Sequence, residues 1–261
     1  MFRVHSSIHK GFSEKSASLF IRFLQSMSRK LAVISGGTRG IGRAIAEEFA
    51  KNNFDIVISA RNEADLAEAK QNIEQTYGVK CFTQKADLSN KEQAIAFAEF
   101  VKSLNQPIGM LTNNAGTFIP GNVHEEADGV LEQLIETNLY SAYHLTRGLI
   151  PTMITQKSGH IFNICSVASL KAYPNGGSYS ISKFALFGFS KVLREEMKNF
   201  GIKVTSIMPG AVYTDSWAGA GIPEERFMTV SDVAETIWSA YSLSKNAVIE
   251  DIVLRPQEGD I

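Results

Sequence analysis

Tyr179 and Lys183 form the most informative pair of reactive side chains in the sequence. If residues 179–200 are helical, a spacing of four places the phenol and the ammonium group on one face of the helix. Ser166 stands thirteen residues before Tyr179 and brings a hydroxyl group that can hydrogen-bond the oxygen of a bound substrate. Together these three side chains predict a site that handles a proton beside a polar oxygen.

Reduction of a carbonyl group by hydride is the reaction that this set suits. Hydride addition leaves an alkoxide that needs a proton, and the phenol of Tyr179 can supply it. A phenol has a pKa of about 10, so a shift of about 3 units toward neutrality requires about 4 kcal/mol of preferential stabilisation of the phenolate. Lys183 and an oxidised nicotinamide ring are both cationic, and we expect them to provide it.

A glycine-rich turn could hold the hydride donor. It follows the apolar residues 31–34 and has the spacing GxxxGxG from Gly36 to Gly42. Glycines let the backbone turn sharply and approach a pyrophosphate, whose charge then lies at the N-terminus of the next helix. Strand, turn and helix in this order predict a dinucleotide cofactor.

Charge indicates which dinucleotide is bound. An NAD enzyme usually places an acidic residue at the end of the second strand, where it binds the ribose 2′-hydroxyl. Ala60 stands there instead, followed by Arg61, and Arg39 lies inside the glycine turn. Two guanidinium groups that face one ribose suit a 2′-phosphate, although they could also be ordinary surface charges. We therefore expect NADP(H).

With these motifs the sequence resembles the short-chain dehydrogenase/reductase family from about Lys30 to the C-terminus. Three further stretches carry the resemblance: Asn113-Asn114-Ala115-Gly116, Asp87-Leu88, and Pro209-Gly210-Ala211-Val212-Tyr213-Thr214. The resemblance implies that the first packs against the glycine turn, the second binds the adenine amine and the third holds the nicotinamide carboxamide.

The resemblance also implies a catalytic tetrad of Asn138, Ser166, Tyr179 and Lys183. In the family pattern Lys183 also binds the nicotinamide ribose, and Asn138 holds a water that links Lys183 to solvent. The implied cofactor-binding residues are Gly36, Thr38, Arg39, Gly40, Ile41, Gly42, Arg61, Asp87, Leu88, Asn114, Ala115, Gly116, Tyr179, Lys183, Pro209, Gly210, Val212 and Thr214.

Continuously apolar strands that alternate with helices predict an α/β fold, a doubly wound Rossmann fold whose parallel seven-stranded sheet has helices on both faces. We expect strands at residues 31–34, 56–58, 79–83, 110–112, 161–164, 204–207 and 252–254. We expect helices at residues 41–49, 61–75, 91–104, 126–150, 179–200 and 231–243, the fourth of them ending at Pro151.

Composition limits the function classes. The net charge of −1 gives no reason to expect nucleic acid, and no apolar run is long enough to cross a membrane. Cys81 and Cys165 lack metal-ligand spacing, so we expect no metal but buried thiols in a reducing, cytoplasmic compartment.

The first 26 residues differ from the rest because they are basic and rich in serine. They are interpreted as a tail left from an upstream start codon, with Met27 as the true start, or as an organelle transit peptide. The expected catalytic domain is a single one, residues 27–261.

The predicted function is NADPH-dependent reduction of a small-molecule carbonyl to an alcohol, a reversible hydride transfer. Alternatives are a catalytically silent NADP(H)-binding sensor and an interaction module, both disfavoured by the intact tetrad. Within enzymes, the alternatives are a 3-oxoacyl reductase and a 3-hydroxy acid dehydrogenase. Residues 250–257 are more similar to the sepiapterin-reductase-like and 3-hydroxy-acid branch of the family.

Apolar residues predict the substrate wall and the oligomeric state. A largely apolar and aromatic set favours a carbonyl compound of moderate size, and it comprises Phe118, Leu170, Tyr173, Trp217 and Met228. Residues 184–189 are apolar on more than one helix face, so the helix needs a second partner besides its own sheet. By resemblance that partner is a second copy, in a homodimer or homotetramer; the alternative is full burial within one chain.

Overall fold

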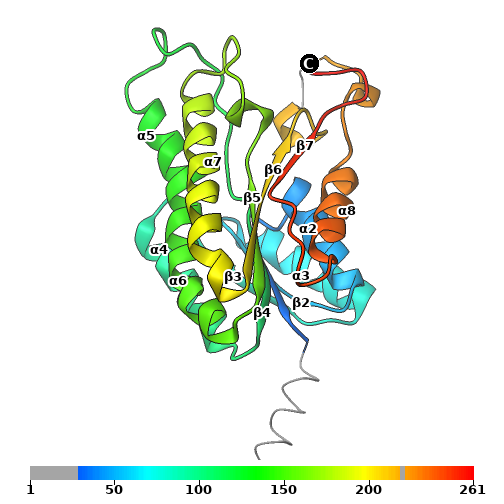
Figure 1. Ribbon diagram of the computed structural model, residues 1–261. Helices are drawn as coiled ribbons and strands as arrows, with labels where there is room; N and C mark the ends of the chain where they lie inside the picture. The colour runs from blue at the N-terminus through cyan, green and yellow to red at the C-terminus, as the bar shows by residue number, and fades with distance from the viewer. Residues whose placement is uncertain (1–28, 218–220) are drawn as a thin grey trace, which may run out of the picture.

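The computed structural model describes residues 29–217 and 221–261 and is built on one seven-stranded sheet (Figure 1). The strand order is β3-β2-β1-β4-β5-β6-β7, and all neighbours pair in parallel. The order reverses between β1 and β4, which is where open α/β sheets bind their ligands. The strands are β1 Leu31–Ser35, β2 Asp55–Ala60, β3 Cys81–Lys85, β4 Ile108–Asn113, β5 Gly159–Ile164, β6 Ile202–Pro209 and β7 Asp251–Leu254.

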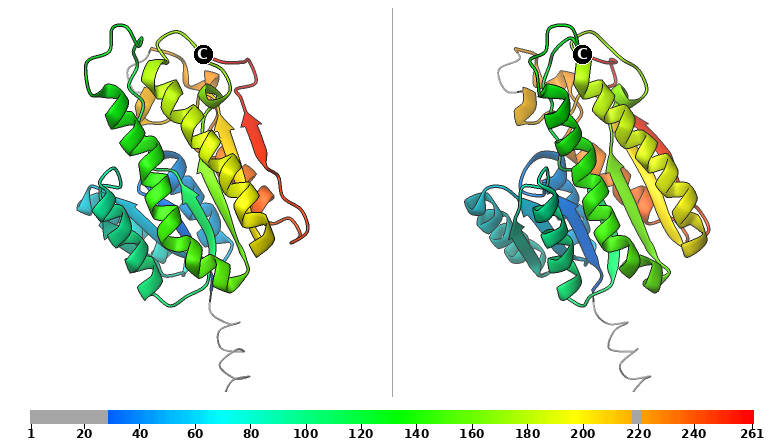
Figure 2. Two further views of the ribbon diagram at one scale, coloured as in Figure 1. Left: turned by 60° about the vertical axis from the view of Figure 1, so that its left-hand side comes forward. Right: turned by 90° about the vertical axis from the view of Figure 1, so that its left-hand side faces the viewer.

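Helices cover both faces of the sheet (Figures 1 and 2). On one face lie α2 (Gly40–Lys51), α3 (Glu63–Tyr77) and α8 (Val230–Tyr241). On the other lie α4 (Lys91–Ser103), α6 (Ser141–Gln156) and α7 (Gly177–Met197). The shorter elements are α5 Val130–Ile135, the π-helical turn η1 Glu136–Tyr140, and the 3₁₀ turns Val167–Ser169, Lys198–Phe200, Asp215–Trp217 and Glu224–Arg226. The predicted doubly wound, single-domain fold is therefore confirmed.

The central strands are apolar on both sides because each side has its own core. In β1, Ala32 and Ile34 pack into the core under α2, α3 and α8, whereas Leu31 and Val33 pack into the core under α4, α6 and α7. All four side chains are fully buried. Burial of a leucine, isoleucine or valine side chain contributes about 1.5–3 kcal/mol, so the sheet is held from both faces.

The prediction that one helix spans residues 126–150 and ends at Pro151 was wrong. Helix α5 begins at Val130, a π-helical turn follows, and α6 continues through Pro151 to Gln156. An internal proline costs about 3 kcal/mol because it removes a hydrogen bond. The Pro151 ring is exposed, and Leu149 and Met153 on the buried face extend the apolar contact across it. Burial therefore outweighs the cost of the proline.

The third strand lies two residues later than predicted, at Cys81–Lys85 instead of 79–83. The Lys80 N–H donates to the Asp55 carboxylate at 3.0 Å, which places the start of β3 after Lys80. Residues 1–26, the predicted leader, lie outside the described residues. Within the described ranges, no helix is long and apolar enough to cross a membrane.

Candidate active site

The glycine turn between β1 and α2 is fixed by contacts that leave no room for side chains. A Cβ on Gly42 would lie 2.2 Å from the Gly36 oxygen and 2.4 Å from Asn114 Nδ2. Gly36 and Gly40 have φ of 67° and 54°, a region that favours glycine. The turn can therefore bring backbone N–H groups at the start of α2 close to a ligand.

The Asn113–Gly116 stretch packs against this turn, as the resemblance implied. Asn114 Nδ2 donates to the backbone oxygens of Ser35 and Gly36 at 3.0 and 2.9 Å. The Ser35 hydroxyl accepts from the N–H groups of Asn114 and Ala115, each at 2.9 Å. Side-chain and backbone bonds thus join the carboxyl ends of β1 and β4 at the reversal of the sheet.

A cleft of about 660 Å³ opens beside the turn. Its lining includes most of the predicted cofactor residues, namely Gly36, Thr38, Arg39, Gly40, Ile41, Gly42, Arg61, Asp87, Leu88, Asn114, Ala115, Gly116 and Thr214. Sequence reasoning missed other lining residues, among them Ser59, Asn62, Asp65, Ser89, Thr117, Gln133, Thr137, Ser141 and Asp215. The positions 133, 137 and 141 recur every four residues, a helical spacing that could have indicated a polar face.

Several features of the cleft fit a dinucleotide. Helix α2 has no acidic residue in its first turn, and its N-cap makes no side-chain hydrogen bond, so its N-terminal N–H groups are available to an anion. The Ser59 hydroxyl is buried against the cleft without a hydrogen-bond partner among the described residues. An unpaired buried hydroxyl is costly, so a bound hydroxyl or phosphate group would satisfy it.

Arg39 and Arg61 both line the cleft, but Arg39 has another partner. Its Nη1 lies 3.2 Å from the carboxylate of Asp215, and both side chains are largely exposed. An exposed ion pair contributes about 0–1 kcal/mol, so a phosphate can displace Asp215 at small cost. Arg61 is exposed at the end of β2 and lies beside the same cleft.

Asp87 also borders the cleft at the end of β3. One carboxylate oxygen, Oδ1, accepts from the N–H and the hydroxyl of Ser89 at 3.1 and 2.7 Å. The backbone N–H of Asp87 is held by Gln93 at 2.8 Å. The carboxylate is thus fixed in place at the cleft wall, where it can accept a hydrogen bond from a ligand amine.

Asn138, Tyr179, Ser166 and Lys183 do not line the cleft itself. Gly116, Thr117 and Phe118 do line it, and they contact the tetrad. A Cβ on Gly116 would lie 3.1 Å from Asn138 Oδ1 and 3.6 Å from Lys183 Nζ. The structure thus brings the predicted reactive side chains together at the end of the cofactor cleft.

Asn138 lies in the π-helical turn η1 and is buried. Its Oδ1 accepts from the Thr117 N–H at 2.8 Å, and its Nδ2 donates to the Thr117 oxygen and to Ser182 Oγ. Single π turns inside helices often occur at functional sites. Because these bonds engage both amide hydrogens, Asn138 could hold a water only through an acceptor oxygen.

Ser166 follows β5 and is held in a short capping arrangement. Its hydroxyl accepts from the Ala168 N–H at 3.1 Å, and its own N–H donates to Ser169 Oγ at 3.2 Å. Ser169 Oγ in turn donates to the Lys183 backbone oxygen at 2.9 Å. Ser169, which sequence reasoning missed, therefore couples the position of Ser166 to helix α7.

Lys183 and Tyr179 lie on the same face of α7, as predicted. Lys183 Nζ donates to the Ile164 backbone oxygen at 2.9 Å and lies 5.8 Å from the centre of the Tyr179 ring. Burial disfavours the ammonium form and lowers the pKa of Lys183 to about 8. The side chain is therefore mostly cationic at pH 7 and readily loses its proton at a slightly higher pH.

The expected lowering of the Tyr179 pKa does not come from the protein alone. Burial raises the pKa of Tyr179, the nearby Cys165 thiol adds to the increase, and a hydrogen bond from Ser166 opposes it. Tyr179 is therefore protonated at neutral pH, which is the state that donates a proton to an alkoxide. Stabilisation of the phenolate needs further positive charge at the site.

Pro209, Gly210 and Val212 do not line the cleft. The Gly210 N–H donates to the Leu254 oxygen at 2.8 Å, and Val212 bridges Met228 in parallel. The flanking bonds, Met228 N–H to Ala211 oxygen and Tyr213 N–H to Met228 oxygen, direct the Val212 peptide groups to the opposite side. One donor and one acceptor there match the pair that a carboxamide presents.

Only some residues of the predicted substrate wall lie near Tyr179 or at an exposed position in the structure. The Phe118 ring lies edge-on to the Tyr179 ring with 4.8 Å between centroids. Leu170 and Tyr173 are exposed on the loop before α7, and Trp217 packs on Phe227. Met228 does not belong to the wall, because its side chain is buried in the core under α8.

Comparison with known proteins gives the class of protein. Residues 30–224 match the family described as short chain dehydrogenase. The sepiapterin reductase of Chlorobaculum tepidum is 32% identical over 241 residues, which cover 89% of this chain and 98% of that protein. The chain therefore belongs to the short-chain dehydrogenase family and is an oxidoreductase.

Two solved structures are similar over nearly the whole chain. L-Sorbose reductase from Gluconobacter frateurii, complexed with NADPH and L-sorbose, is 29% identical, covers 88% of this chain and 96% of its own, and has a TM-score of 0.82. An alcohol dehydrogenase from the archaeon Thermococcus sibiricus, complexed with 5-hydroxy-NADP, is 25% identical over 88% of this chain and 97% of its own, with a TM-score of 0.81.

Proposed function

We propose that this chain reduces a small-molecule carbonyl compound to an alcohol with NADPH, and that Tyr179 is the proton donor. The observation that carries the proposal is the convergence of Tyr179, Lys183, Ser166 and Asn138 at the end of a cleft that fits a dinucleotide. The cofactor is NADP(H): arginines line the cleft where an NAD enzyme usually has an acid, and similar proteins are complexed with NADP or NADPH.

Each member of the tetrad has a distinct task in this proposal. Ser166 donates a hydrogen bond to the carbonyl oxygen and fixes its position, while the cofactor supplies the hydride when it is bound. Tyr179 transfers its phenolic proton to the oxygen that becomes the alcohol. Lys183 provides positive charge that stabilises the resulting phenolate, and the Asn138 bonds hold helix α7 against η1.

The remaining cofactor residues are proposed from their positions. The helix α2 N-terminus binds the pyrophosphate, Arg39 and Arg61 bind the 2′-phosphate, and Asp87 binds the adenine amine. The Val212 peptide groups bind the carboxamide, and the Lys183 ammonium binds the nicotinamide ribose. Phe118 at the Tyr179 ring favours a substrate with an apolar or aromatic group beside its carbonyl.

Exposed apolar residues on α7 support a homodimer or homotetramer. Ile181, Phe184 and Val192 on α7 are 44%, 44% and 58% exposed, which is unusual for side chains of this kind gathered on one helix. A second copy could cover them. A sensor without catalysis is disfavoured because such a protein has no need for both Tyr179 and Lys183 in the buried arrangement found here.

Substitution Tyr179→Phe tests the proposed role. The variant keeps the ring packed on Phe118 but has no proton to donate, so we expect turnover of carbonyl compounds by NADPH to fall by about 10²–10⁴-fold. Stopped-flow or steady-state NADPH oxidation measures turnover, and NADPH fluorescence measures binding, which should not change. Turnover equal to that of the wild type would refute Tyr179 as the donor.

A further inference from the structure

The N-terminus of α7, which carries Tyr179 and Lys183, has no cap of its own. Helix α7 begins at Gly177, its N-cap Gly176 makes no side-chain hydrogen bond, and its first turn has no acidic residue. Such an end leaves N–H groups without partners and carries partial positive charge. The helix therefore needs an acceptor from elsewhere in the chain.

Glu126 supplies that acceptor from the loop before α5. Its Oε1 accepts from the Ser178 N–H at 2.9 Å, and its Oε2 accepts from the Ser178 hydroxyl. Carboxylates favour helix N-termini because they satisfy donors and oppose the helix dipole. Ser178 precedes Tyr179 directly, so Glu126 holds the residue next to the proposed proton donor.

Two glycines make room for this carboxylate. A Cβ on Gly177 would lie 2.1 Å from Glu126 Oε1 and 2.5 Å from the Gly121 oxygen. A Cβ on Gly121 would lie 2.7 Å from Glu126 Cγ. The Gly121 N–H also donates to the Asn175 oxygen at 3.0 Å. We refer to residues 121–126 and 175–178, joined in this way, as the clasp.

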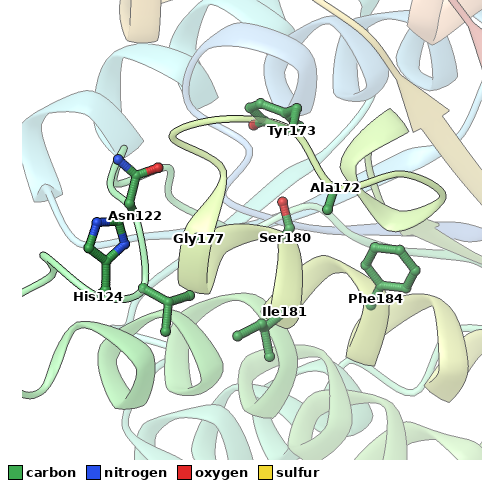
Figure 3. A pocket seen from close by; sticks show the side chains of 9 residues that line it. Asn122, His124, Ala172, Tyr173, Gly177, Ser180, Ile181 and Phe184 are labelled. Carbon is green, nitrogen blue, oxygen red and sulfur yellow. The ribbon is translucent and has the colours of Figure 1, made fainter.

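The clasp joins the segment next to Phe118 to the segment next to Tyr179. Phe118 lies just before the first segment and Tyr179 just after the second, and their rings are in edge contact. Figure 3 shows Asn122 and His124 on the first segment beside Gly177 at the start of α7. The clasp also borders a separate, mostly apolar hollow of about 530 Å³, to whose lining Asn122, His124 and Gly177 belong.

We propose that Glu126 is a positioning residue for the reaction: through the first turn of α7 it fixes the Tyr179 phenol relative to Phe118 and the substrate. This proposal rests on the proposed function. It assigns Glu126 no proton transfer, because its carboxylate oxygens are both engaged by Ser178. Glutamine can keep both contacts, because its Oε1 can accept from the Ser178 N–H while its Nε2 donates to the Ser178 hydroxyl, which can also act as an acceptor.

The test compares Glu126→Ala, Glu126→Gln and Gly177→Ala with Asp128→Ala, an exposed acid in the same loop. We expect Glu126→Ala to lower kcat about tenfold through displacement of the phenol, with NADPH affinity within about twofold of the wild type. Gly177→Ala should act similarly because its Cβ must push the carboxylate away. Glu126→Gln should rescue most of the loss, and Asp128→Ala should match the wild type.

Two readouts separate positioning from other roles. In Glu126→Ala, kcat should be lower at all pH values, and the inflection of its pH profile should not shift. Loss of the inflection would instead indicate that Glu126 acts as an acid or base. Amide hydrogen exchange should rise in residues 177–180 only. Equal losses of kcat, NADPH affinity and melting temperature, or an unchanged kcat in Glu126→Ala, overturn the proposal.

Hydrogen exchange also tests the positioning role of Glu126 independently of the proposed function. If the wild type reduces no carbonyl compound with NADPH, the proposed function fails, and the exchange of residues 177–180 still decides whether Glu126 holds the turn. Unchanged exchange in both Glu126→Ala and Gly177→Ala overturns the positioning role whatever the activity.

Discussion

The two ends of the sheet each bury a basic side chain, with different outcomes. At the carboxyl end, Lys183 has a pKa of about 8 and borders the tetrad and Gly116. At the amino end, His160 at the start of β5 has a pKa of about 3 and is enclosed by aromatic rings. Burial lowers both pKa values, yet only Lys183 has a charge that a bound ligand could use.

Hydrogen bonding explains why His160 is structural. The Thr205 hydroxyl donates to the Ile249 oxygen at 2.5 Å, so it accepts from His160 Nε2 at 2.7 Å, and the ring is the neutral tautomer with hydrogen on Nε2. The Nδ1 atom has no partner among the described residues, and the ring stacks on Phe162 at 3.9 Å. A buried titratable group thus indicates function only when it also lies beside a cleft, as Lys183 does next to the cleft residue Gly116.

The largest effect is expected from exchanging each buried base for an apolar side chain. Lys183→Met should lower turnover by about 10²–10⁴-fold, because phenolate stabilisation is lost. His160→Phe should leave turnover per folded molecule unchanged, since the ring is far from the tetrad along β5. NADPH oxidation is measured on both variants. A loss of turnover in His160→Phe as large as that in Lys183→Met would contradict the difference proposed between the two buried bases.

Alanine substitutions at two glycines, one at each end of the sheet, should differ in their effect on cofactor affinity. Gly42→Ala forces a Cβ against the Gly36 oxygen, so we expect NADPH affinity to fall by about 10²-fold, in line with an overpacking cost of about 1–3 kcal/mol. Gly78→Ala, at the end of α3, meets open space but has a positive φ, so it should cost stability without affecting NADPH. Fluorescence titration and thermal melts distinguish the two effects.

The sequence predicted the carboxyl end well because its chemistry restricts residue types. A turn that must approach a phosphate requires Gly36, Gly40 and Gly42, and a tetrad requires its own spacing, so both are visible without coordinates. Asn138 lies close to the other three predicted side chains, but the π-helical turn that carries it was not expected, because no residue type marks such a turn.

The contacts that hold the site were less visible because they are long-range. Glu126 reaches Ser178 and Arg39 reaches Asp215 across the fold, and either acid looks like an ordinary surface residue in the sequence. Pro151 led to the wrong predicted helix end, because the energetic cost of a proline inside a helix follows from the residue type alone. The burial of Met153, which compensates for that cost, depends on tertiary packing and is not visible in the sequence. Likewise, Met228 is apolar in either environment, and only packing places it in the core.

Substitution of arginines at the two ends of the sheet tests which of them determine the preference for NADPH. Arg39→Ala with Arg61→Ala should reduce the NADPH-to-NADH affinity ratio about 30-fold, since charge-assisted bonds to a 2′-phosphate contribute about 1.5–3 kcal/mol. Arg29→Ala removes a pair with Asp55 at the amino end and should not alter the ratio. Parallel titrations with both cofactors measure it, and an unchanged ratio in the double variant would leave the two arginines as surface charges.

The smallest expected effect is the loss of stability in acid that His160 contributes at the amino end of the sheet. His160 has a folded pKa of about 3 against an ordinary value of 6.5, so below pH 6.5 the unfolded chain binds a proton that the folded chain does not. Its contribution to stability is therefore complete above pH 6.5 and is lost as the pH falls toward 3.

Between pH 7.5 and 5.5 we expect a loss of about 1.4 kcal/mol, at 1.36 kcal/mol per pKa unit, which is about 3–6 °C in melting temperature. His160→Phe should remove this part of the decrease while Lys183→Met retains it, because the Lys183 pKa lies above this pH range. Equal acid sensitivity in His160→Phe and the wild type would assign the loss to other groups.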